Sequence, residues 1–275
     1  MKNILYGTMY SFKEIKNSKI FYSFLIFALI LIFGSYFVSQ TSFISQGRIM
    51  VDFSIFSITI FNIFIGIFIG SSIVYDDAEN KSIFLSITRP VKRTDYLTGR
   101  FLGLTVAIIF STIIMMLIFY AVLLIMHKYI MPVIFTPAAD LVIQALFIII
   151  ESVFISVVAL LFSLITSKSL AVVFTMLVFF IGNVSSKMND LVRPVKRIID
   201  GKIIIVHQAA GVLTGIIHFI YAVLPNFQIF NISSEAAYKI PIPAHAIFYR
   251  AVYGLCYTIL LFIISSLIFA RKDIS

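Results

Sequence analysis

The sequence predicts an all-α integral membrane protein with six transmembrane helices. Of its 275 residues, 61% are hydrophobic and 12% are charged, and the mean hydropathy of +1.08 lies outside the range of soluble globular domains. Apolar runs of roughly 17 to 25 residues recur, the length that crosses about 30 Å of hydrocarbon. All seven prolines fall outside these runs, as expected of residues that interrupt helices. We expect spans at 20–40, 53–75, 100–126, 141–165, 169–185 and 248–270.

The distribution of basic residues predicts that both termini are cytoplasmic. Cytoplasmic loops carry an excess of Lys and Arg, whereas the loops after the first and third runs hold one each, Arg48 and Lys128. The loop 186–247 is also basic, but a segment of this length translocates largely regardless of its charge, so we place it outside. The net charge of +9 therefore indicates membrane topology and no nucleic-acid partner, and we expect a prokaryotic cytoplasmic (inner) membrane. The predicted inner side carries Lys2, Lys13, Lys16, Lys19, Lys81, Arg89, Lys92, Arg93, Arg100, Lys168, Arg271 and Lys272.

Residues 1–19 predict an amphipathic helix on the inner membrane surface, with a disordered basic tail as the alternative. Apolar residues recur at helical spacing on one side, and polar residues occupy the other. The apolar set is Ile4, Leu5, Met9, Phe12 and Ile15, and the polar set is Lys13, Lys16 and Asn17.

The second span contains Asn62, Gly66 and Gly70 at four-residue steps. A Gly-x-x-x-Gly pair lets another helix backbone approach closely, and an asparagine can hydrogen-bond across such a contact. We expect a helix contact, within one subunit or between two, or a place on a translocation pathway. Gly99 and Gly103 repeat the pattern more weakly.

The fourth span carries three polar residues, Asp140, Gln144 and Glu151, whose spacing places them on one helical face. A carboxylate near the middle of a span costs about 2.5–3.5 kcal/mol on insertion scales. Glu151 is therefore either a substrate- or proton-facing group or a hydrogen-bonded side chain that locks helices together.

The loop 186–247 contains a second amphipathic stretch, 203–224, which we expect to lie on or re-enter the outer leaflet. A seventh span here would place the C-terminal tail outside. Its two histidines, eleven residues apart, stand about 16 Å apart along a helix, so they cannot share a metal ion, and no metal site is predicted. The polar face consists of His207, Gly211, Thr214 and His218.

Sequence motifs of catalysis are absent. There is no phosphate-binding G-x-x-x-x-G-K-[ST] loop, no H-E-x-x-H and no G-x-S-x-G. The single cysteine, Cys256, lies within an apolar run and permits no intrachain disulfide. We expect a protein that is not an enzyme and binds no cofactor of its own.

The connector between the second and third spans, 76–101, is dense in charge for so apolar a chain. Acidic residues open it, where they complement a helix dipole, an apolar group including Phe84 follows, and Arg89-Pro90 ends the first helical piece. Such a segment suits docking to another protein, or it is a solvated loop whose charges only fix topology.

The connector resembles the signature of ABC-2 type transporter permeases, roughly E-x-G-T-L-x-x-L-L-S-x-P-V-x-R-x-x-x-L-x-G-K. The matching residues are Glu79, Ser82, Ser86, Arg89, Pro90, Val91, Arg93, Tyr96, Leu97, Gly99 and Arg100, with Ser82 where glycine is usual and Arg100 where lysine is usual. Three further regions are similar to the family: Phe12-Lys13-Glu14, Leu224-Pro225-Asn226 and Phe269-Ala270-Arg271-Lys272-Asp273.

The resemblance implies a six-helix subunit of ABC-2 exporter type. It implies an N-terminal interfacial elbow helix, a cytoplasmic coupling helix within 76–99 and an outer-leaflet helix before the last span, in one permease domain. Two copies of a separate ATP-binding subunit, which hold ATP and Mg, and a second permease copy or a paralogue are the implied partners. The implied ATPase-coupling residues are Asp76, Asp77, Glu79, Phe84, Arg89, Pro90 and Arg93.

Two other functions stay open. A secondary transporter or channel would use Asp140, Gln144 and Glu151 and need no ATPase. A permease-like component of a membrane assembly or maturation system would lack transport of its own. The substrate is not readable from the sequence.

Overall fold

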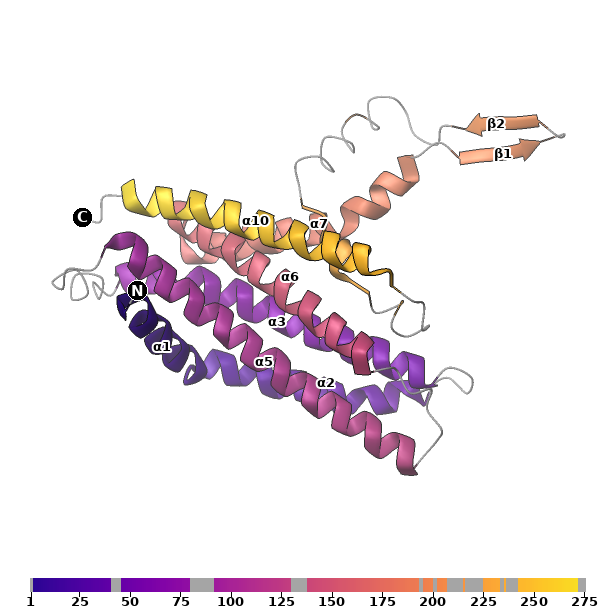
Figure 1. Ribbon diagram of the computed structural model, residues 1–275, viewed down its shortest axis with the longest axis horizontal. Coiled ribbons are helices and arrows are strands. Elements are labelled where there is room, and N and C mark those ends of the chain that lie inside the picture. Colours follow the sequence, from indigo (N-terminus) through magenta and orange to yellow (C-terminus); the bar gives the residue numbers. More distant parts are fainter. Residues whose placement is uncertain are drawn as a thin grey trace. The chain divides into compact units, whose positions relative to one another are not determined.

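The computed structural model describes residues 2–40, 46–79, 92–129, 138–192, 195–199, 202–206, 215, 225–232, 235 and 242–271. Long helices make up most of this part of the chain (Figure 1). In chain order the elements are α1 Lys2–Lys16, α2 Lys19–Ser39, α3 Gln46–Glu79, α5 Arg93–Tyr129, α6 Ala138–Ile165, α7 Lys168–Val192, β1 Val195–Ile199, β2 Lys202–Val206, η1 Phe227–Phe230 and α10 Ala244–Arg271.

The six predicted spans are confirmed: α2, α3, α5, α6, α7 and α10 are each long and apolar enough to cross a membrane. Each predicted run lies within one helix, to within a residue. On both sides of the connector the helices extend beyond their runs: α3 continues to Glu79 and α5 begins at Arg93. The outer parts of the predicted connector are therefore turns of these helices, since no proline or glycine stops them there. Helix α7 likewise continues past its run to Val192.

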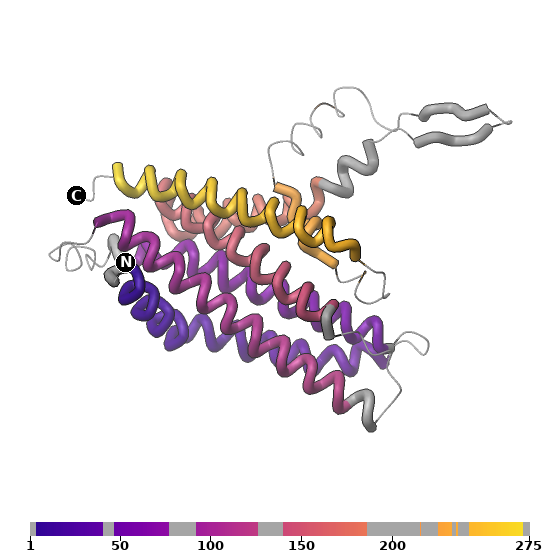
Figure 2. Tube along the Cα trace, in the orientation of Figure 1, coloured from indigo at the N-terminus to yellow at the C-terminus, as the bar shows by residue number. Residues whose placement is uncertain are grey.

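The described chain forms two compact units, and each is described by itself. Unit 1 is Met1–Thr175 with Phe230–Ser275, and unit 2 is Met176–Ile229. In unit 1, α3, α5, α6 and α10 run alongside one another and α1 lies along the first half of α5 (Figure 2).

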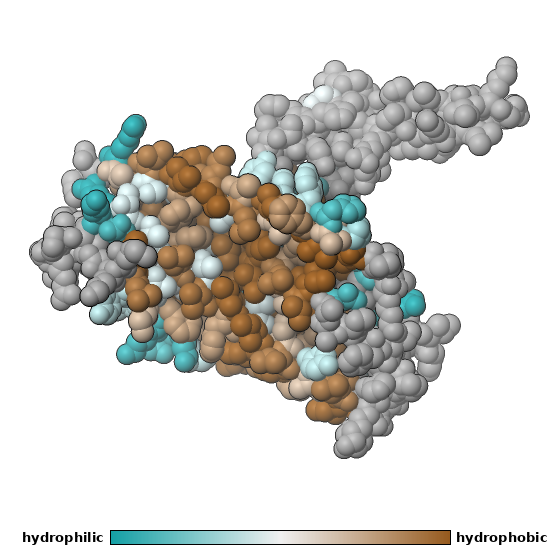
Figure 3. Space-filling model, in the orientation of Figure 1, coloured by the Kyte–Doolittle hydropathy of each residue, from teal (hydrophilic) through white to brown (hydrophobic). Residues whose placement is uncertain are grey.

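The core of unit 1 lies around α3 and α6, the most buried of the candidate spans. Apolar side chains of neighbouring helices meet in two clusters, one toward each end of α3. Figure 3 shows a band of hydrophobic side chains across unit 1 with hydrophilic residues gathered at its ends, the pattern of a protein that crosses a bilayer. The largest fully buried side chains include Phe21, Phe61, Phe119, Phe147, Phe154 and Phe230.

Unit 2 contains a β-hairpin that the sequence analysis did not predict. Strands β1 and β2 pair antiparallel, with Val195 opposite Val206 and Ile199 opposite Lys202. The predicted outer-leaflet helix from residue 203 is wrong in its first residues, which belong to β2. Both strands are rich in isoleucine and valine and an Asp-Gly pair separates them, a strong hairpin signal. Apart from Gly215, residues 207–224, and with them the predicted polar face, lie outside the described residues.

Candidate functional site

The two helices that flank the connector reach the same end of unit 1, which we call the connector end. The ring of Tyr96, near the start of α5, stacks on Phe269 near the end of α10, with centroids 6.2 Å apart. The last turns of α3 meet the start of α7 through Asp76 and Lys168. The start of α1 and the last turn of α10 also lie at this end (Figure 1). The connector end therefore gathers parts of α1, α3, α5, α7 and α10.

Two glycines of α5 allow α1 to contact its backbone. A Cβ added to Gly99 would stand 3.2 Å from the Cα of Gly7, and one on Gly103 would stand 3.0 Å from the carbonyl oxygen of Thr8 and crowd Ser11. No side chain fits between the two helices at these positions. Gly7 and Ser11 form the matching small pair on α1, a sequence signal that the analysis of the α5 glycines missed.

Arg100 fixes α1 to the first turns of α5. It is 6% exposed and forms an ion pair with Glu14 of α1. Its Nε donates a hydrogen bond to the Tyr96 hydroxyl at 3.3 Å, and its guanidinium lies 5.8 Å from the ring centre of Tyr10. A planar guanidinium can pair with a carboxylate and stack on aromatic rings at once, which an ammonium group cannot. Arg100 thus acts at a helix contact.

The predicted amphipathic face of α1 is divided in the structure. Ile15 is buried, while Leu5 and Met9, which we placed on the same face, are each 63% exposed beside Tyr6 and Tyr10. Small residues at Gly7 and Ser11 and the rings of Phe12 and Phe110 face each other across the contact with α5, while Leu5 and Met9 point away from the bundle.

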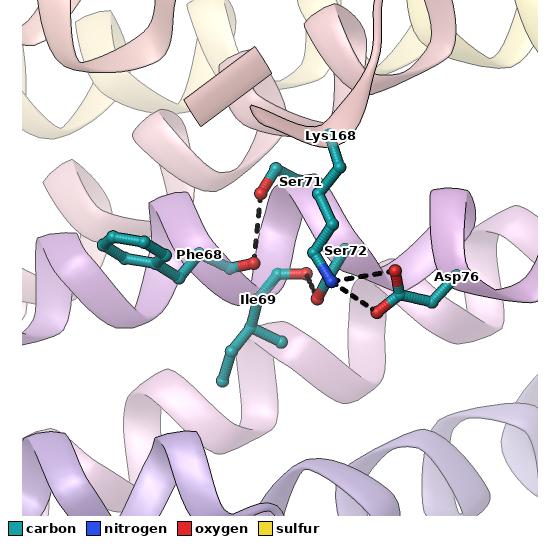
Figure 4. Close-up of polar contacts among 6 residues, drawn as sticks. All are labelled: Phe68, Ile69, Ser71, Ser72, Asp76 and Lys168. Atoms are coloured by element: carbon teal, nitrogen blue, oxygen red, sulfur yellow. Dashed lines mark hydrogen bonds and ion pairs between the residues drawn. The ribbon is translucent and has the colours of Figure 1, made fainter. Parts of the chain in front are cut away.

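At the last turns of α3, Asp76 is engaged by its own chain. The Lys168 Nζ donates to both carboxylate oxygens of Asp76 at 2.8 Å (Figure 4). Nearby, the Ser71 and Ser72 hydroxyls donate to the carbonyls of Phe68 and Ile69 in the same helix, both at 3.1 Å. The carboxylate predicted to contact an ATPase thus already has a cation beside it.

The other predicted coupling residues flank or fall within the connector. Asp77 and Glu79 belong to the last turn of α3, and Arg93, which begins α5, is exposed. Phe84, Arg89 and Pro90 lie outside the described residues.

In the middle of the bundle, Asn62 joins α3 to α5. It is fully buried, its Oδ1 accepts a hydrogen bond from the Ser111 hydroxyl at 2.6 Å, and its Nδ2 donates to the Ile58 carbonyl at 2.9 Å. The structure places this side chain in a helix contact.

Gly66 and Gly70 face α6. A Cβ on Gly66 would stand 2.9 Å from the Ser152 carbonyl oxygen, and one on Gly70 would stand 2.9 Å from that of Ser156. This close approach joins the two most buried helices of unit 1, so the pair forms a packing seam inside this chain.

The three polar residues predicted on one face of α6 differ in burial, and a hydrogen bond is described for Gln144. Gln144 is buried, and its Oε1 accepts a hydrogen bond from the backbone N–H of Ile232 at 3.2 Å. Next to it the ring of Phe147 meets Phe230 at 6.4 Å. Gln144 thus fastens the segment before α10 to the start of α6. Glu151, two turns deeper, is 5% exposed, and Asp140 is partly exposed near the beginning of the helix.

Within unit 2, the Pro225-Asn226 element forms a capped turn against α7. The Asn226 Oδ1 accepts a hydrogen bond from the N–H of Gln228 at 3.0 Å. The ring of Phe227 lies 5.9 Å from that of Phe179. A Cβ on Gly182 would stand 2.6 Å from the Pro225 carbonyl oxygen, so Gly182 makes room for the turn.

In the described residues, no group of three or more His, Cys, Asp or Glu side chains is placed to hold a metal ion. The polar contacts described above join helices to one another.

The comparison with known families agrees with this arrangement. The sequence model of the family described as ABC-2 family transporter protein matches residues 11–274, which include all six candidate spans and the connector. No curated protein matches the chain. Because the family match covers nearly the whole chain and the six helices are apolar enough to cross a bilayer, this integral membrane protein belongs to the ABC-2 family of transporter proteins, as a membrane component of the permease type.

Proposed function

We propose that this chain is the membrane-spanning permease subunit of an ATP-driven exporter, and that its connector receives the motion of a separate ATP-binding subunit. Energy then enters as a conformational bias, since ATP binding favours one arrangement of the transmembrane helices over another. The chain itself binds no cofactor in this proposal, because ATP and Mg are held by the partner.

The observation that carries the proposal is the anchoring of both ends of the connector. On one side, α3 extends to Glu79 and is held at Asp76 by Lys168. On the other, α5 starts at Arg93 and is packed against α1 by Gly99 and Gly103. A displacement of the connector would therefore be transmitted to α3 and α5.

Contacts inside the bundle could transmit movement from the connector end to the other helices. The hydrogen bond between Asn62 and Ser111 links α3 to α5, and the Gly66 and Gly70 seam links α3 to α6. Closely packed helices move as rigid bodies rather than deform continuously. A push at the connector end is thus expected to move α3, α5 and α6 together.

The partners follow from the family. We propose two copies of an ABC ATP-binding subunit at the connector end and a second permease copy or a paralogue in the membrane. The connector end faces the cytoplasm of a prokaryotic cell in this arrangement, with both termini inside. The exposed apolar residues of α1 then lie at the inner membrane surface, where tyrosine side chains are favoured.

Co-purification tests the proposal. The tagged chain is expressed with its genomically adjacent ATP-binding protein, extracted in detergent, and assayed for ATP hydrolysis. We expect a stoichiometric complex that Glu79→Lys with Arg93→Glu disrupts, because both changes reverse charge at the anchors of the connector. Arg48→Glu, near the opposite end of α3, is the matched control and should leave the complex intact. A chain that never retains the ATPase in any nucleotide state contradicts the proposal.

A further inference from the structure

The ion pair between Asp76 and Lys168 joins segments 92 positions apart in the sequence. Asp76 lies one turn before the end of α3, and Lys168 is the first residue of α7. The pair therefore connects the last turns before the connector to the turn between α6 and α7 (Figure 4).

The turn beneath Lys168 is short. Only Thr166 and Ser167 separate α6 from α7. The Thr166 N–H donates to the Phe162 carbonyl at 2.8 Å, and the Ala171 N–H donates to the Ser167 carbonyl at 2.9 Å, so both helices remain hydrogen-bonded up to the turn. The backbone of Lys168 thus belongs to a helix that is hydrogen-bonded up to the turn.

Each of the two charges lies at the end of its own helix that the helix dipole disfavours, and the partner's charge compensates it. A cation at the first position of α7 is disfavoured by the positive end of the helix dipole, whereas a carboxylate there is favoured. Asp76 supplies that carboxylate, with both oxygens at 2.8 Å from the Nζ. The side chains of Lys168 and Asp76 are 40% and 45% exposed, and exposed ion pairs contribute little to folding stability. Breaking the pair should therefore leave the fold intact, so its effect on the position of α3 can be tested in a folded protein.

We propose that Lys168 is a positioning residue that holds the last turns of α3 against the α6–α7 turn, so that movement of the connector is passed to α6 and α7. The inference rests on the proposed function, since it needs a partner that moves the connector. It also reassigns Asp76 from a contact with the ATPase to a contact within the permease.

The test measures whether α7 responds to nucleotide. A cysteine replaces exposed Ser169, in the first turn of α7, in a Cys256→Ser background, and the chain is purified with its ATPase. Labelling by a water-soluble maleimide is measured with and without a non-hydrolysable ATP analogue. The variants are Asp76→Asn, Lys168→Gln and the exchange Asp76→Lys with Lys168→Asp. Complex yield and melting temperature are recorded for each.

We expect the single variants to assemble normally and lose the nucleotide-dependent change in labelling, and the exchanged pair to regain it. High salt should reduce the change in the wild-type complex, because the pair is half exposed to solvent. The control is Arg250→Gln, which breaks the separate ion pair between Arg250 and Glu235 and should leave the response unchanged.

The outcomes separate this inference from the function on which it rests. Single variants that respond like the wild type, or an exchanged pair that fails to recover, overturn the role of Lys168 while leaving the permease proposal standing. A wild-type chain that binds no ATPase contradicts the proposed function and this inference together. A wild-type chain that binds its ATPase without any response at position 169 overturns this inference alone.

Discussion

Gly103 of α5 lies directly against Ser11 of α1, with so little space that a methyl group on Gly103 would stand 3.0 Å from the Thr8 carbonyl oxygen and the Phe12 amide nitrogen. The N-terminal helix is therefore a packed part of unit 1. Its contact lies within the first turns of α5, immediately after the connector, where a mechanical link to an ATPase would act.

The first prediction concerns this contact. Gly103→Ala should destabilise the protein by about 1–3 kcal/mol, because an added methyl group in a filled contact forces the backbones apart. The melting temperature in detergent and the yield of monodisperse protein report the loss. Gly34→Ala in α2 is the control, since a Cβ there meets nothing within 4 Å. Equal melting temperatures for the two variants would contradict the contact.

The second prediction tests the link between α3 and α5. Asn62→Ala and Ser111→Ala should be coupled in a double-mutant cycle, because each removes one partner of the same buried hydrogen bond. Such bonds in membrane helices average about 0.6 kcal/mol and reach about 1.7 kcal/mol. Unfolding in mixed micelles measures the coupling energy. Additive single effects would show that the two side chains do not interact.

The third prediction concerns the segment before α10. Gln144→Leu removes the acceptor for the Ile232 N–H and leaves a buried donor unpaired, which costs about 1–3 kcal/mol. The segment should then open more often, and a cysteine at exposed Asn231, in a Cys256→Ser background, should react faster with a maleimide. Gln144→Glu keeps an acceptor oxygen and should restore slow labelling. Unchanged labelling in the leucine variant would remove Gln144 from this role.

The fourth prediction separates the ATP-driven function from an ion-driven one. If nucleotide supplies the energy, Glu151→Gln should leave the ATPase activity of the complex near that of the wild type, because the change keeps the shape of a 5%-exposed side chain. Glu151→Lys should lower the amount of protein in the membrane, since a buried cation costs about 2.5–3.5 kcal/mol. Flux through the purified chain alone in liposomes, abolished in the glutamine variant, would favour the secondary transporter instead.

The spans were predictable because length and hydropathy determine them almost alone. An apolar run of about 20 residues has one stable form in hydrocarbon, a helix that satisfies its own backbone. The ends of α3 and α5 were less predictable, since the charged turns beyond Tyr75 and before Gly99 read as a separate connector. A helix that leaves the bilayer continues until a residue stops it, and hydropathy does not report that point.

The sequence predicted that some helices approach closely, but not which helices contact each other. The spacing of Gly66 and Gly70 indicated a close helix approach, but the partner, α6, follows from the three-dimensional arrangement. Arg100 and Glu14 are 86 positions apart, and a contact between residues so far apart produces no periodic pattern in the sequence. The hairpin of β1 and β2 had a local signal in its Asp-Gly pair, which the surrounding apolar residues masked because they also fit a helix.

The measurement that tests the central claim most directly is site-specific crosslinking from the connector. A photoreactive amino acid replaces Phe84, the chain is expressed with its ATP-binding protein, and membranes are irradiated. The same amino acid at Ala244, the first residue of α10 and therefore at the opposite end of that helix from the connector end, serves as the control. Crosslinking to the ATP-binding protein from position 84 but not from 244 is the predicted result. Absence of that product from position 84, in membranes that contain both proteins, would contradict the role of the connector.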